Sequence, residues 1–209
     1  MINISYIFFC HILKPIYLIY FYYNIYFSEK IYLTNKNYLS KGRFKKVFIH
    51  PNDNNKCIKV LHQKNGLWDI INEEFRFFII NEKTNNLPFF YQVIQTNLGN
   101  GLVFELIRDY NGKLSLTLNE YIEILKNKDD NFKKNFIFNF EKFTFNHINK
   151  YLSNYQHFNN IMIKFINDNE YRFIVIDDYD YNNKYYLNSE YIKKDVLRFV
   201  NKLKNKLSD

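Results

Sequence analysis

The stretch Leu39–Val60, LSKGRFKKVFIHPNDNNKCIKV, contains the pattern that decides the fold. Gly42 marks a turn after a first segment, Lys30–Leu39, whose apolar residues predict a strand. Alternating side chains then predict a second strand at Lys46–Ile49 and a third at Lys56–Leu61. Between these two strands a proline fixes one backbone angle, and the Asn and Asp side chains that follow can hydrogen-bond to their own backbone, which is typical of a turn. The stretch therefore predicts consecutive antiparallel strands.

The third of these strands carries one lysine, Lys59, between Ile58 and Val60. Because side chains alternate along a strand, Lys59 shares a face with Cys57 and Leu61, while Ile58 and Val60 occupy the other face. A lysine among apolar neighbours at a sheet edge usually faces solvent. Beneath a glycine turn, its ammonium would instead neutralise nucleotide phosphates. A glycine turn followed by an apolar strand with one lysine is how a protein-kinase-like fold opens.

Length and composition limit the classes of protein to which this stretch can belong. The chain has 209 residues and a mass of 25.8 kDa, enough for one core or for two small lobes. Aromatic residues make up 20% of it, and the many Asn and Ile residues beside them indicate a compositional bias rather than a functional use. The net charge of +8 would suit an anionic partner, but the lysines are scattered. We therefore expect a solvated basic surface and not a nucleic-acid-binding protein.

The two cysteines, Cys10 and Cys57, stand in apolar contexts without the spacing of metal ligands. Disulfides persist in oxidising compartments and are rare in the cytosol. The cysteines therefore predict a reduced, cytoplasmic protein without disulfides.

Residues 1–28 form a strongly apolar N-terminal extension. A membrane span needs about 20 predominantly apolar residues, but Lys14, Pro15 and His11 interrupt this segment. It also has neither the basic start nor the small-residue cleavage site of a secretory signal. Three interpretations stay open: a dispensable or non-native extension upstream of the true start, a membrane or interfacial anchor, and a packed element. Membrane association follows only from the second.

Two blocks of the sequence resemble the YrbL family of PhoP regulatory network proteins. The first block comprises the turn Ser40–Arg43, the step Phe48–Pro51 and the triplet Cys57–Lys59. The second is Gly101–Leu118, GLVFELIRDYNGKLSLTL, which follows a predicted strand at Tyr91–Thr96. This resemblance covers roughly residues 31–180.

The resemblance implies an α+β fold, a reduced bilobal protein-kinase-like fold. An N-lobe with an antiparallel sheet would take residues 29–108, and a shortened, mainly helical C-lobe would take 109–209. The C-lobe would contain the predicted helices and strands, which are Leu118–Lys126, Asn135–Leu152, Ile161–Ile166, Tyr171–Ile176 and Ser189–Leu207. The final helix has one apolar stripe, which predicts packing on the lobe and, less favourably, binding at a membrane surface.

Such a fold implies ATP and Mg²⁺ as cofactors. Gly42 would let the backbone approach a phosphate, and Lys59 would neutralise it. The predicted helix Trp68–Asn81 contains Glu73 and Glu74, and the family pattern selects Glu74 as the partner of Lys59. A hinge at Glu105–Ile107 would meet the adenine edge through its backbone.

The C-lobe would supply the magnesium ligands. Asn160 takes the place of the asparagine that ligates magnesium in the kinase catalytic loop. Asp177, at the end of a predicted buried strand, matches the metal-binding aspartate. Mg²⁺ is commonly held by one or two carboxylates together with phosphate oxygens. The resemblance therefore implies a metal site formed by Asn160 and Asp177.

The catalytic aspartate of that loop is missing. Tyr155 stands in its place, and a phenol with a pKa of about 10 cannot accept a proton at neutral pH without a large perturbation. His157 is the only nearby base, which leaves enzymatic activity undecided. The first hypothesis is therefore a YrbL-like regulatory protein that binds ATP and Mg²⁺, transfers phosphate weakly or not at all, and acts through conformation or a protein partner. An active atypical kinase and a basic scaffold that binds no nucleotide are the alternatives.

Overall fold

The computed structural model describes residues 19, 23, 29–42, 45–61, 85–151, 157–177 and 189–208. The described residues up to 61, with Phe89–Leu106, form one compact unit, and residues 85–88 with those from Ile107 onward form a second. Of the apolar extension, only Ile19 and Tyr23 are described; both are helical and exposed. The three interpretations of residues 1–28, and the predicted domain boundaries, therefore stay predictions.

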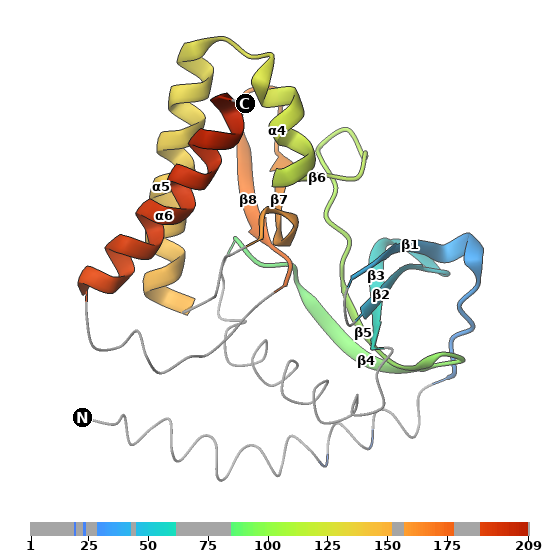
Figure 1. Ribbon diagram of the computed structural model, residues 1–209. Coiled ribbons are helices and arrows are strands. Elements are labelled where there is room, and N and C mark those ends of the chain that lie inside the picture. Colours follow the sequence, from blue (N-terminus) through green and yellow to red (C-terminus); the bar gives the residue numbers. More distant parts are fainter. Residues whose placement is uncertain are drawn as a thin grey trace. The chain divides into compact units, whose positions relative to one another are not determined.

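The first unit is built on a five-stranded antiparallel sheet with the order β1-β2-β3-β5-β4 (Figure 1). A short 3-10 helix, η2, precedes it. The bounds are η2 Asn35–Asn37, β1 Tyr38–Lys41, β2 Lys45–His50, β3 Asp53–Leu61, β4 Phe90–Thr96 and β5 Gly99–Glu105. The second and third predicted strands of the deciding stretch are thus present as β2 and β3, and β3 lies at the centre of the sheet.

One face of this sheet carries the apolar core of the first unit. The core cluster consists of Leu33, Phe48, Ile58, Val60, Ile94 and Val103. The register pairs Ile58 with Phe48 on one side and with Val103 on the other, whereas Lys59 pairs with Val47 and Leu102. The predicted alternation of β3 is therefore confirmed, because Ile58 and Val60 face this core and Lys59 points to the opposite face.

The strand predicted over Lys30–Leu39 is wrong for most of its length. Ile31 forms only an isolated bridge with Thr96, and η2 interrupts the segment before β1 begins. Hydrogen bonds from two asparagine side chains explain the difference. Asn97 accepts a hydrogen bond from the Leu33 N–H and donates one to the Leu33 carbonyl. The side chain of Asn37 accepts from the Thr34 N–H. These contacts replace a sheet ladder.

The described part of the second unit contains three helices, a 3-10 turn and a three-stranded sheet with the order β6-β7-β8. The bounds are β6 Leu116–Thr117, α4 Leu118–Lys126, α5 Asp130–Tyr151, η3 Phe158–Asn160, β7 Ile161–Phe165, β8 Tyr171–Val175 and α6 Ser189–Ser208. The predicted helices and the predicted strand pair are present. α5 begins at Asp130 rather than Asn135, because the Asp129 side chain accepts from the Phe132 N–H and starts the helix earlier.

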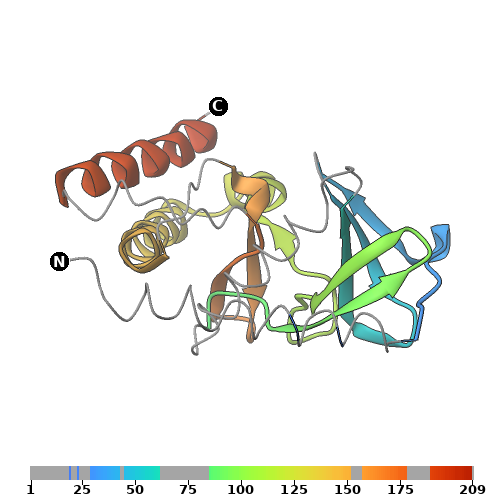
Figure 2. The same cartoon turned by 90° about the horizontal axis from the view of Figure 1, so that it is seen from below.

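Aromatic side chains form much of the core of the second unit. The ring of Phe140 on α5 lies 5.4 Å from those of Phe173 on β8 and Phe199 on α6. α5 and α6 lie side by side (Figures 1 and 2). The apolar stripe of α6 is buried, and its described members are Val196, Phe199, Val200 and Leu203. The stripe therefore packs on the unit, as predicted, and does not present an apolar face to a membrane surface.

An α+β fold with antiparallel sheets is thus confirmed. Across the described parts of the chain, no helix combines the length and the apolar character that crossing a membrane requires.

Candidate functional site

Lys59 lies in the centre of the first unit. Its side chain is only 7% exposed, and its Nζ lies 4.7 Å from the centroid of the Phe104 ring on β5. Removing a charged group from water is costly unless other groups compensate. The negative face of the aromatic ring offsets part of that cost. The structure therefore places a buried cation on the third strand, beside an aromatic ring.

Gly42 closes the turn between β1 and β2. Its N–H donates to the Lys45 carbonyl over 2.8 Å. Among the described residues, a Cβ added at Gly42 would meet only that carbonyl, at 3.7 Å, which is an ordinary contact. The described residues therefore leave room for a side chain at position 42.

The predicted hinge residues have several backbone groups already in use. The Glu105 N–H donates to the Phe89 carbonyl over 2.8 Å, and the Glu105 carbonyl lies 3.8 Å from the Cys57 Sγ. Burial raises the pKa of the Cys57 thiol, which keeps it protonated. Ile107 is buried, and its carbonyl accepts from the Ser115 N–H over 3.1 Å. An adenine would thus have to use other backbone groups than the Glu105 N–H.

The two predicted metal ligands lie at the same end of the β7–β8 hairpin. Asn160 ends η3, and its carbonyl accepts from the Ile176 N–H over 2.9 Å. Asp177 follows directly, and both residues are half-buried. The exposed His157 is tied to the same turn, because its carbonyl accepts from the Asn160 N–H over 3.0 Å. The fold therefore brings the backbones of all three residues together.

Within the described residues, no group of three or more His, Cys, Asp and Glu side chains could hold a metal ion. An amide oxygen and one carboxylate suit Mg²⁺ only when waters or phosphate oxygens complete its shell. Asn160 and Asp177 therefore fit a metal that arrives with a phosphate ligand better than a resident structural metal.

Two predicted residues, Glu74 and Tyr155, lie outside the described residues, as does the predicted helix Trp68–Asn81. The pairing of Glu74 with Lys59 and the role of position 155 therefore stay predictions.

One organising residue, Asp109, was not among the predicted site residues. Its Oδ1 accepts from the Ser115 Oγ over 2.6 Å and from the Phe165 N–H over 2.9 Å. The neighbouring Tyr110 donates its N–H to the Phe165 carbonyl and its hydroxyl to Asp168. These contacts fix the loop after the first unit onto the end of β7. Asp109 lies inside the second block that resembles the YrbL family, but no pattern in that block indicated its contacts.

Fold and candidate residues define an α+β protein of two compact units, one with a buried lysine on its central strand and the other with an Asn–Asp pair at a hairpin end. Residues 31–207 match the model of the family described as PhoP regulatory network protein YrbL, and the chain belongs to this family.

Among curated proteins, the chain is similar to the uncharacterized protein YrbL of Escherichia coli (strain K12) and to that of Shigella flexneri. Each is 30% identical over 94 residues, which are 43% of this chain and 45% of the relative. The chain thus spans less than half the length of these curated relatives in the match.

Proposed function

We propose that this YrbL-family chain is a regulatory protein with a reduced, bilobal kinase-like fold that binds ATP and Mg²⁺ and transfers phosphate weakly or not at all. The family description supports the regulatory part. The observation that carries the nucleotide part is the burial of Lys59 on the third strand of an antiparallel sheet. In protein kinases the phosphate-binding lysine also lies on the third strand, beneath a glycine turn.

Each candidate residue has a role in this proposal. Gly42 admits the phosphates close to the backbone, Lys59 neutralises them, and Glu74 holds Lys59 in place. The backbone of Glu105–Ile107 reads the adenine edge. Asn160 and Asp177 hold Mg²⁺, which would neutralise charge on the phosphates.

Weak or absent phosphotransfer follows from the residue at the place of the catalytic aspartate. The phenol of Tyr155 is a poor base at neutral pH. His157 is exposed, and its carbonyl accepts from the Asn160 N–H. In the described part of the chain, no contact fixes the orientation of its imidazole. The protein would therefore regulate through a change of its conformation or by binding a regulatory protein partner. A cytoplasmic location belongs to the same proposal, because the thiol of Cys57 is buried and free of any disulfide.

Thermal unfolding in the presence of ATP tests the proposal. A ligand that binds only the folded state raises the unfolding midpoint by an amount that grows with the logarithm of the ligand concentration above its dissociation constant. We expect ATP to raise the midpoint of the wild type and not that of Lys59→Ala. Lys56→Ala is the matched control, because Lys56 lies on the same strand but on the other face, paired with Asp53 at 2.9 Å. An equal response of all three proteins to ATP would contradict the role of Lys59.

The response to ATP, together with phosphate-release and nucleic-acid-binding assays, separates the alternatives. Release or transfer of the ATP γ-phosphate at a steady rate would favour an active atypical kinase. A wild type that shows no response to ATP at any concentration would leave a scaffold that binds partners without nucleotide. Salt-sensitive binding of a DNA or RNA duplex would favour a nucleic-acid partner for that scaffold.

A further inference from the structure

Strand β8 lies at the edge of the described three-stranded sheet, next to β7. An edge strand presents a row of backbone N–H and C=O groups on its open side. One residue, Asn86, binds two of these groups on β8. Its carbonyl accepts from the Val175 N–H over 2.9 Å, and its Nδ2 donates to the Phe173 carbonyl over 2.9 Å. Asn86 therefore takes the place of a further strand along this part of β8.

The side-chain amide of Asn86 is what makes both contacts possible. The open side of β8 offers one donor and one acceptor here, so a partner must supply both a carbonyl and an N–H. Asn86 supplies the carbonyl from its main chain and the N–H from its side chain. An ionised aspartate has the same size but only accepts hydrogen bonds. The contact with the Phe173 carbonyl thus depends on the amide.

The segment that carries Asn86 is held a few residues further on. Pro88 is buried, and its ring restricts the backbone. The Phe89 N–H donates to the Oε2 of Glu105 over 3.3 Å, and the Phe89 carbonyl accepts from the Glu105 N–H over 2.8 Å. Asn86 therefore belongs to a short segment that is restrained on both sides.

The groups that Asn86 binds lead directly to a candidate metal ligand. Ile176 follows Val175, and its N–H donates to the Asn160 carbonyl over 2.9 Å. Asp177 is the next residue. Backbone contacts therefore hold the end of β8 on two sides, through Asn86 on the open edge and through Asn160 on the side of β7.

We infer that Asn86 is a positioning residue of the candidate Mg²⁺ site, because it fixes the end of β8 and so keeps Asp177 next to Asn160. The inference rests on the proposed function and adds to it a residue that was not among the predicted site residues. Groups behind the ligands of a metal commonly orient these ligands and thereby set the affinity for the metal. Asn86 acts through Asp177, so its loss should affect only those steps that need the metal.

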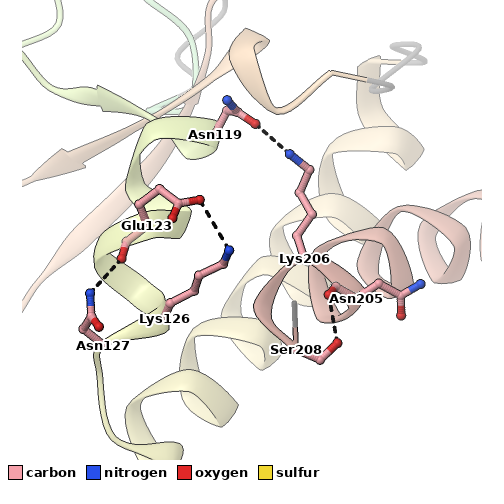
Figure 3. A network of polar contacts seen from close by, with 7 residues as sticks. All are labelled: Asn119, Glu123, Lys126, Asn127, Asn205, Lys206 and Ser208. Atoms are coloured by element: carbon pink, nitrogen blue, oxygen red, sulfur yellow. Dashed lines mark hydrogen bonds and ion pairs between the residues drawn. The ribbon is translucent and has the colours of Figure 1, made fainter.

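Titration calorimetry of the full chain with ATP, with and without Mg²⁺, tests this role. We expect Asn86→Ala to weaken ATP binding about fivefold in Mg²⁺, the size of one net hydrogen bond, and to leave binding without Mg²⁺ unchanged. Asn127→Ala is the matched control, because the Asn127 Nδ2 also donates to a carbonyl of the second unit, that of Glu123 on α4, over 3.1 Å (Figure 3). An equal Mg²⁺ effect in both variants, or a loss that is the same with and without Mg²⁺, would overturn the inference.

Hydrogen exchange of the Val175 and Ile176 amides, measured without nucleotide, separates this inference from the proposed function. We expect both amides to exchange about fivefold faster in Asn86→Ala than in the wild type or in Asn127→Ala. Unchanged exchange would overturn the inference even if ATP and Mg²⁺ bind. Faster exchange in a protein that binds no ATP would support the contact with β8 but overturn the proposed function, and with it the role of Asn86 at a metal site.

Discussion

Two glycines of the first unit differ in what their surroundings tolerate. A Cβ at Gly101 would lie 2.6 Å from the Cγ2 of Ile58, a fully buried core residue, whereas a Cβ at Gly42 has room. We expect Gly101→Ala to lower the free energy of unfolding by about 1–3 kcal/mol, the range for an overpacked core. Gly42→Ala should change it by less than about 0.5 kcal/mol. Urea denaturation of both variants measures this, and equal losses would contradict the packing described for Gly101.

Asp109 is predicted to stabilise the second unit through its two acceptor contacts. Asp109→Ala leaves the Phe165 N–H and the Ser115 hydroxyl without their acceptor, which costs about 1–3 kcal/mol when the group is withdrawn from water. Asp109→Asn keeps an acceptor oxygen and should cost less. Asp130→Ala is the control, because the Asp130 carboxylate is 89% exposed. Urea denaturation in which Asp109→Ala and Asp130→Ala lose the same stability would contradict the assignment.

At the scale of single residues, the sequence predicts those features that depend on residues close by in the chain. The face of Lys59 followed from strand alternation alone. The role of Asp109 did not, because its acceptor contacts reach residues 6 and 56 positions away in the chain. No local pattern indicates such partners.

At the scale of elements, the end of β2 should confer a pH dependence. Burial, and secondarily the charge of Lys56, lowers the pKa of His50, while Asp53 opposes this shift. The unfolded chain, in which histidine has its ordinary pKa of about 6.5, therefore binds more protons than the folded chain as the pH falls. His50 thus contributes stability that is fully present above about pH 6.5 and is lost as the pH falls through its lower folded-state pKa.

Urea denaturation of the wild type between pH 7.5 and pH 5 measures this dependence. We expect stability to fall with pH in the wild type and to fall less steeply in His50→Gln. His157→Gln, at an exposed histidine, should behave as the wild type does. A His50→Gln curve parallel to that of the wild type would show that His50 is not the group responsible.

Helix α6 offers two leucines in contrasting positions. Leu203 is fully buried in the second unit, whereas Leu197 is 52% exposed. We expect Leu203→Ala to cost about 2–5 kcal/mol of unfolding free energy, as core leucine truncations do. Leu197→Ala should stay within about 0.5 kcal/mol of the wild type. A similar cost for both variants, measured by thermal or urea unfolding, would mean that α6 does not pack on the unit by this stripe.

Elements with strong periodicity and local caps were predictable. The bounds of α4 were predicted correctly, and its Thr117–Glu120 capping box is a local signal. β6 was not predicted, because it has two residues and exists only by pairing with β7. The break between Ile31 and β1 was not predicted for a related reason. The Leu33 N–H donates to the side chain of Asn97, which lies far along the chain.

At the scale of the whole molecule, the sequence predicted the α+β class and the family correctly, because both rest on patterns within the described units. The arrangement of the candidate site was less predictable from the sequence. Lys59 belongs to the first unit, and Asn160 and Asp177 belong to the second. The residues of the nucleotide proposal thus come from both units, and local sequence patterns do not predict which residues of separate units act together.

The affinity for ATP, measured by titration calorimetry with and without Mg²⁺, tests the nucleotide proposal most directly. The account predicts that Lys59→Ala weakens binding under both conditions, because its ammonium meets the phosphates themselves. Asp177→Asn should weaken binding only when Mg²⁺ is present, because its carboxylate acts through the metal. A wild type that binds no ATP at millimolar concentration, or an Asp177→Asn variant with unchanged affinity in Mg²⁺, would contradict the account.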